Sequence, residues 1–222
     1  MEIITYTGGS VQTNGYLIKT ESGIFVFDAP EGINDFIGSK NLIADHLFLT
    51  HQHFDHVEDA DIITAKKYSY ADYDPDLVLD QRAREWGLAI NVPPFSIDQI
   101  LKGETSITIG DLTIDILHVP GHSPDSMAFH FPSEGALFGG DALFAGGVGR
   151  TDLPHGEHDI LMASIVEKLY TLPKDTRVFP GHGPATTIGP GPYTHLTPPT
   201  HPPVEISDVP ATLKKKNKNH TY

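Results

Sequence analysis

Alternating apolar and polar side chains predict strands along most of the first 189 residues, with a few helical stretches between them. The continuous apolar run at 24–28 predicts a strand buried on both faces. The stretch at 157–171 has the clearest helical period, because its apolar side chains recur every three or four positions. The expected strands are 2–7, 15–20, 24–28, 46–50, 104–109, 112–118, 126–131, 136–139 and 177–180, and the expected helices are 32–40, a segment beginning at 57, 75–87 and 157–171.

The pattern ends near Gly189, where proline becomes frequent. Proline has no backbone N–H and interrupts regular structure. The prolines concerned are Pro190, Pro192, Pro198, Pro199, Pro202, Pro203 and Pro210. A lysine cluster at 214–218 follows, and we interpret it as solvated. The sequence therefore predicts one domain over 1–189 and an irregular tail over 190–222.

Composition narrows the functional classes. The chain has 222 residues and no cysteine, which excludes disulfides, thiolate ligands and a cysteine nucleophile. Its formal net charge of −14 disfavours a nucleic-acid partner, because such a chain repels a phosphate backbone. No apolar run approaches 18 residues, so no membrane span is expected. The N-terminus lacks the basic-then-apolar pattern of a signal peptide, and the expected location is cytoplasmic.

Candidate metal ligands follow four of the predicted strands. The run at 51–56, His-Gln-His-Phe-Asp-His, comes directly after the apolar residues 47–49, and three later loops each carry one more ligand-type side chain. A catalytic zinc needs about three protein ligands, so seven residues with one shared carboxylate suffice for two ions. We predict Asp141 as the shared carboxylate. The seven candidates are His51, His53, Asp55, His56, His122, Asp141 and His182.

These motifs, in this order, resemble the metallo-β-lactamase superfamily, and the stretch from Gly140-Asp141 to Asp152 is similar to its glyoxalase II branch. The resemblance covers about residues 2–189. It implies an α+β fold, a four-layer αββα sandwich. It places His51, His53 and His122 on one metal, and Asp55, His56 and His182 on a second, with Asp141 bridging. Asp55 and Asp141 are the expected catalytic residues.

The function expected from this resemblance is hydrolysis of a thioester, or of a related activated acyl ester, as in hydroxyacylglutathione hydrolases. The partner is then a small molecule, and the cofactors are two divalent ions. Zinc is the first candidate, with iron or manganese as alternatives, because imidazole and carboxylate ligands suit all three. An iron-dependent persulfide dioxygenase of the same superfamily, or a lactonase, is the alternative function. The thiol part of the substrate and the oligomeric state stay open.

Four further assignments concern residues outside the seven candidates. Arg150 is expected either to bind a substrate carboxylate or to form an ordinary ion pair. Asp28 either orients the ligand loop or caps a turn, and we favour the turn. Trp86 is expected in the core. The histidines that fit no ligand spacing are His46, His118, His130, His155, His158, His195, His201 and His220.

Overall fold

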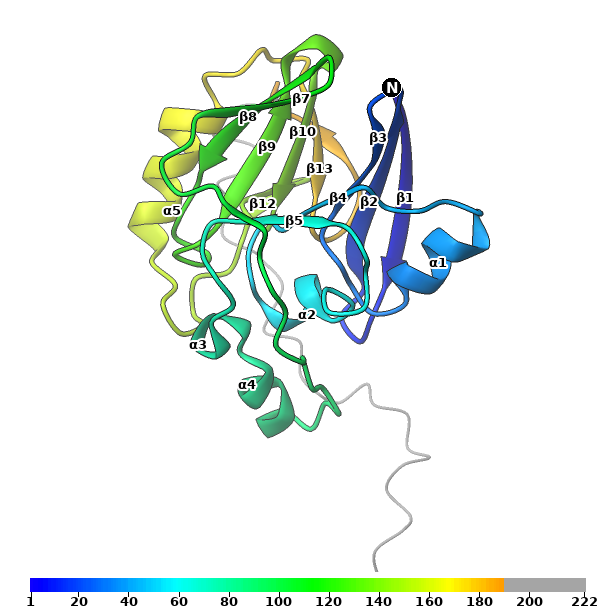
Figure 1. Cartoon of the computed structure of the whole chain (residues 1–222). Coiled ribbons are helices and arrows are strands. Elements are labelled where there is room, and N and C mark those ends of the chain that lie inside the picture. Colours follow the sequence, from blue (N-terminus) through cyan, green and yellow to red (C-terminus); the bar gives the residue numbers. More distant parts are fainter. Residues whose placement is uncertain (190–222) are drawn as a thin grey trace, which may run out of the picture.

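Two six-stranded sheets face each other in the computed structural model, which describes residues 1–189 (Figure 1). The first sheet has the order β1-β2-β3-β4-β5-β6, and its strands are β1 (Glu2–Gly8), β2 (Thr13–Thr20), β3 (Gly23–Phe27), β4 (His46–Phe48), β5 (Lys66–Ser69) and β6 (Gln99–Ile100). The second has the order β14-β13-β10-β9-β8-β7, and its strands are β7 (Ser106–Ile109), β8 (Leu112–His118), β9 (Met127–Phe131), β10 (Ala136–Gly140), β13 (Arg177–Pro180) and β14 (Thr186–Thr187). A small hairpin joins β11 (Leu143–Phe144) to β12 (Gly147–Val148).

Successive side chains along each strand point to opposite faces, and this alternation builds three apolar layers. In β2, Leu17 lies in the outer layer and Ile18 in the layer between the sheets. In β10, Leu137 lies in the other outer layer, whereas Phe138 packs between the sheets and stacks on Phe27 at 4.3 Å between ring centroids. The central strands β2 and β10 are therefore apolar on both faces, whereas the edge strands β1 and β7 keep exposed positions.

Helices cover the two outer faces (Figure 1). Ile33 and Ile37 of α1 join the outer layer of the first sheet, and Leu161 of α5 joins that of the second. The arrangement is the expected α+β, four-layer αββα sandwich. The helices are α1 (Ile33–Ser39), α2 (Phe54–Val57), α3 (Pro75–Val78), α4 (Asp80–Glu85) and α5 (His158–Ser164), with a π-helix at Ile165–Leu169 and a 3-10 turn at Pro132–Glu134.

One edge of the sandwich collects the loops that carry the candidate ligands. β3, β4 and β5 are parallel to one another, so their C-terminal ends lie on the same edge of the first sheet. In the second sheet β10 is parallel to β13 and antiparallel to β9, which is antiparallel to β8. The C-terminal ends of β8, β10 and β13 therefore share one edge as well.

Two helix predictions were wrong in their bounds, and a third, at 157–171, was confirmed to within two residues. The helix expected from residue 57 is instead the four-residue α2, and turns follow it. The helix expected at 75–87 is broken at Leu79, whose φ of 58° lies in the left-handed region. The helix expected at 157–171 begins at His158 and passes into a π-helix at Ile165.

The prediction of a buried Trp86 was also wrong, because its side chain is 41% exposed. Five short strands escaped prediction: β5, β6, β11, β12 and β14. The irregular tail expected at 190–222 lies outside the described residues. Within residues 1–189, the helices are all too short to span a membrane.

Candidate metal centre

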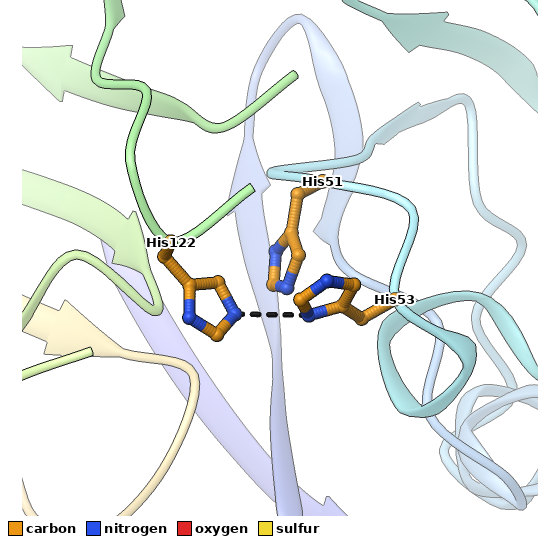
Figure 2. A group of neighbouring side chains, drawn as sticks. All are labelled: His51, His53 and His122. Atoms are coloured by element: carbon orange, nitrogen blue, oxygen red, sulfur yellow. Dashed lines mark hydrogen bonds between the residues drawn. The ribbon is translucent and has the colours of Figure 1, made fainter. Parts of the chain in front are cut away.

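The first group of ligand atoms comes from three buried histidines, His51, His53 and His122, and Figure 2 shows their rings facing one another. His51 and His53 come from the loop after β4, and His122 comes from the loop after β8. Their nitrogens all lie within 4.8 Å of one another, and His53 Nδ1 is 2.9 Å from His122 Nε2. Two loops from different sheets thus present three imidazole nitrogens to one point.

The second group consists of Asp55, His56 and His182, whose ligand atoms also lie within 4.8 Å of one another. Asp55 and His56 belong to α2, and His182 follows β13. Asp55 Oδ2 is 3.2 Å from His182 Nε2 and 3.5 Å from His56 Nε2. The side chain of His182 is 30% exposed whereas those of the other two are buried, so solvent reaches the centre beside His182.

Asp141 lies between the two groups. Its Oδ2 is 3.6 Å from His122 Nε2 of the first group and 3.5 Å from His182 Nε2 of the second. Its Oδ1 is 3.4 Å from His56 Nε2. A carboxylate in contact with histidines of both groups is placed as a bridging ligand needs to be.

Buried atoms without hydrogen-bond partners indicate that this centre fits cations. Among residues 1–189, His51 Nε2, His56 Nε2 and Asp141 Oδ1 are buried without a hydrogen bond, and the last two face each other at 3.4 Å. A buried polar atom left unpaired is costly, and nitrogen and oxygen donors of this kind are the usual ligands of zinc, iron and manganese. The donor set therefore suits two divalent ions.

The outer nitrogens of three of the histidines are held by neighbouring oxygens. His56 Nδ1 is 2.8 Å from Asp28 Oδ2, His122 Nδ1 is 2.7 Å from the carbonyl oxygen of Arg150, and His51 Nδ1 is 3.1 Å from Thr50 Oγ1. Each ring then directs its Nε2 toward the centre. Such contacts fix the tautomer and the orientation of a ligand.

Asp28 does more than cap a turn, so our preferred interpretation of it was wrong. It follows β3 directly, and the parallel pairing of β3 with β4 brings it beside Thr50. Its Oδ1 accepts the Thr50 N–H at 2.7 Å, and its Oδ2 accepts both the Thr50 hydroxyl at 2.8 Å and the N–H of His56. One carboxylate thus holds the start of the ligand loop and a ligand in the second group.

Replacing Asp28 with asparagine is expected to weaken metal binding at the second group about 10- to 100-fold, because the carboxylate that orients His56 loses its charge. Asparagine tolerates the φ of 59° at this position, so the backbone is not disturbed. Competition with a chromophoric chelator measures the affinity. Asp45→Asn is the control, since Asp45 also accepts a backbone N–H, that of Ile24, but precedes β4 at the opposite edge. Equal affinities in the two variants would contradict this role.

The two groups differ in the protonation state of their histidines. Burial, followed by the neighbouring histidines, lowers the pKa of His51 well below its ordinary value and that of His53 to about 3. Burial also lowers the pKa of His122. Burial acts on His56 and His182 in the same direction, but nearby carboxylates, Asp55 and Asp141 among them, outweigh it and raise both pKa values. Without metal, the first group is neutral at pH 7, while the second holds protons.

Acid is therefore expected to release the second ion before the first. An ion entering the second group must displace the protons of His56 and His182, so its affinity falls as the pH falls from neutrality. An ion in the first group displaces none until well below the ordinary histidine range. Calorimetric titrations at pH 7 in two buffers should show that the second ion releases more protons than the first. Equal proton release by both ions would contradict the assignment.

Residues outside the seven candidates also hold the ligand loops, and the sequence analysis missed them. The Thr13 hydroxyl donates to Asp55 Oδ2 at 2.6 Å. Buried Asp125 accepts the backbone N–H of Gln52, between His51 and His53, at 3.0 Å and also accepts the Ser123 hydroxyl. An aspartate three residues after a candidate ligand in a glycine- and proline-rich loop was the available signal.

Arg150 lies beside the centre through its backbone. Its guanidinium Nε and Nη2 each donate to Asp152, at 2.7 Å, and its carbonyl oxygen faces His122. In the structure, therefore, the side chain of Arg150 forms an ion pair, the second of the two alternatives expected from the sequence. A third set of neighbouring ligand atoms, from His51, His56 and Asp141, connects the two groups. Within residues 1–189, the histidines expected to be non-ligands belong to none of these sets.

Comparison with known families agrees with this geometry. The family model described as "Metallo-beta-lactamase superfamily" matches residues 8–182. The chain belongs to the metallo-β-lactamase superfamily, and its fold and histidine and aspartate cluster are those of a metal-binding hydrolase.

Three proteins are similar to this chain in sequence or in structure. The probable metallo-hydrolase YqgX of Bacillus subtilis is 34% identical over 196 residues, covering 81% of this chain and 89% of the relative. The hydroxyacylglutathione hydrolase GloC of Haemophilus influenzae is 37% identical over 150 residues, covering 64% and 70%. The crystal structure of TTHA1623 in a di-iron-bound form superposes with a TM-score of 0.74 at 37% identity, covering 87% of this chain and 98% of that one.

Proposed function

We propose that the protein is a dinuclear metal-dependent hydrolase of acyl thioesters or related activated esters. The observation that carries this proposal is Asp141, whose two oxygens lie 3.4–3.6 Å from histidines of both ligand groups. A second complete group of ligands, sharing this carboxylate with the first, offers a second ion a place to bind. Similarity to GloC, which is named a hydroxyacylglutathione hydrolase, supports a thioester as the substrate.

In this proposal His51, His53 and His122 hold one ion, Asp55, His56 and His182 hold the other, and Asp141 bridges them. Zinc is the first candidate, and iron and manganese are compatible with the same ligands. Two such ions supply a water of lowered pKa and polarise a carbonyl oxygen. Hydrolysis then needs no side-chain nucleophile, consistent with a chain without cysteine.

Protein groups around the centre orient the proposed ligands and keep the two carboxylates negatively charged. Asp55 and Asp141 are the proposed catalytic residues, and the pKa of each is below its ordinary value, because the neighbouring histidines outweigh the effect of burial. Both carboxylates are thus ionised and ready to bind cations at neutral pH. The Thr13 hydroxyl holds Asp55 in place, and the partly exposed side of the centre beside His182 is the proposed entrance. Arg150 is the proposed substrate-binding residue at the rim.

The test is hydrolysis of S-lactoylglutathione and of a panel of neutral thioesters and lactones, measured with the metal content of the same sample. Thioester hydrolysis that stops on chelation and returns with added zinc, iron or manganese supports the proposal. Protein that carries two ions per chain and hydrolyses no acyl compound defeats it. One iron per chain with oxygen uptake in the presence of glutathione persulfide favours the dioxygenase instead.

A further inference from the structure

Trp86, which directly follows α4, is the chain's single tryptophan, and its side chain is 41% exposed. The guanidinium of Arg150 lies 6.0 Å from the centre of its ring system. Tryptophan is enriched at binding interfaces, where its ring supplies a large apolar contact area. The backbone oxygen of Arg150 faces His122, so the residue whose guanidinium lies over this ring also contacts a candidate metal ligand.

The segment that carries Trp86 is also held to the metal centre at its start. The side chain of Gln52, between His51 and His53, donates to the Asp72 carbonyl oxygen at 2.9 Å and accepts the Asp74 N–H at 2.9 Å. From there the chain continues into α3 and α4, which lie at the same end of the molecule as α2 (Figure 1). The segment thus contacts the loops around the metal centre at its start, through Gln52, and at Trp86, through Arg150, and we call this segment and Arg150 the rim of the centre.

The negative charges on this rim disfavour a substrate that carries several carboxylates. Asp152 occupies Nε and Nη2 of Arg150, Asp80 pairs with Arg84 at 2.6 Å, and Glu85 pairs with Arg82 at 2.7 Å. Every arginine on the segment and beside it thus already has a carboxylate partner, and Asp72, Asp74 and Asp76 add further negative charge. A substrate that carries several carboxylates meets like charge here.

We propose that Trp86, backed by Arg150, is a specificity-determining surface for an uncharged, flat apolar part of the substrate. The substrate class is then neutral thioesters with an aryl group, in preference to thioesters of glutathione. This inference rests on the proposed hydrolase function. It goes beyond that function because it identifies the residue that selects the substrate and the kind of group selected.

The first experiment compares two neutral thioesters of N-acetylcysteamine, one with a phenylacetyl and one with an acetyl group, on the metal-loaded enzyme. Trp86→Ala is expected to lower the ratio of kcat/KM for phenylacetyl over acetyl about tenfold, mainly through KM, because ring contacts of this kind are lost. Trp86→Phe should keep most of the ratio. Ile43→Ala is the control, since Ile43 is 78% exposed and precedes β4 at the opposite edge. An unchanged ratio in Trp86→Ala overturns the proposal.

The second experiment releases Arg150 from its partner. Asp152→Asn should raise kcat/KM for S-lactoylglutathione about threefold relative to the neutral aryl thioester, because an exposed ion pair no longer competes for the guanidinium. A preference for S-lactoylglutathione over the neutral aryl thioester in the unmodified enzyme contradicts the proposed substrate class.

Fluorescence separates this inference from the function on which it rests. All tryptophan emission comes from residue 86, so a non-hydrolysable phenethyl thioether of N-acetylcysteamine should change it at saturating concentration whether or not catalysis occurs. A change in emission without hydrolysis of any thioester retains the rim surface and defeats the hydrolase proposal. Hydrolysis of aryl thioesters without a change in emission defeats the rim surface and retains the hydrolase.

Discussion

Replacing Asp141 with asparagine is expected to lower hydrolysis by about 10³-fold or more and to reduce the bound metal from two ions to one. The charge that two divalent ions contribute to catalysis is worth several kcal/mol, and every 1.36 kcal/mol is a factor of ten in rate. Asparagine keeps the shape of the side chain but removes the negative charge between His56 and His122. Elemental analysis and kcat/KM for the best thioester measure the two effects.

Asp115→Asn is the matched control for this prediction. Asp115 is a carboxylate on β8 that pairs with His130 at 3.1 Å, outside the groups of ligand atoms. This variant should retain both ions and full activity. A folded Asp141→Asn protein that still carries two ions and hydrolyses thioesters at the original rate would remove the bridging role.

A methyl group at Gly181 is expected to disrupt the second ligand group. A Cβ there would collide with Asp141 Oδ1 and lie 2.5 Å from His56 Cε1, so at least one of these side chains must move. Displacing a catalytic group by about 1 Å costs on the order of 10²-fold in rate. Gly181→Ala should therefore lose at least about 100-fold in kcat/KM and bind the second ion weakly.

Gly139→Ala provides the comparison, because its added Cβ would meet Val178 Cγ1 at an ordinary distance of 3.7 Å. Gly139 lies in β10, two residues before Asp141, so the two variants make the same change near the same centre. Thermal unfolding of both metal-loaded proteins shows whether each is folded. If the two variants have equal activity and equal metal content, the centre does not require the close approach of Asp141 and His56 to the Gly181 backbone.

The ligand loops could be predicted from the sequence because each follows an apolar strand. Strands that end at one edge bring their loops together, and this made His51, Asp141 and His182 candidates for one site despite their separation in the chain. Asp28 was harder to interpret, since its role depends on which strands pair. Only the parallel pairing of β3 with β4 places its carboxylate beside Thr50 and His56.

Three features of the fold could not be predicted from the pattern of apolar and polar residues. β5 begins with Lys66 and Lys67, which conceal a strand whose later residues are buried. The helical pattern at 75–87 is consistent with one helix, but the left-handed Leu79 divides it. The pattern also cannot say which face of a helix remains uncovered, and for that reason Trp86 was assigned to the core. Tertiary contacts, which a single sequence does not display, decide all three.

The most direct test of the dinuclear centre is the metal content of purified protein, measured with thioester hydrolysis during stepwise chelation and reloading. The proposed function predicts two ions per chain in the fully loaded state, and activity that disappears as the second group empties and returns as it refills. Full hydrolytic activity in a folded protein stripped of both ions, or saturation at one ion per chain with full activity, would contradict it.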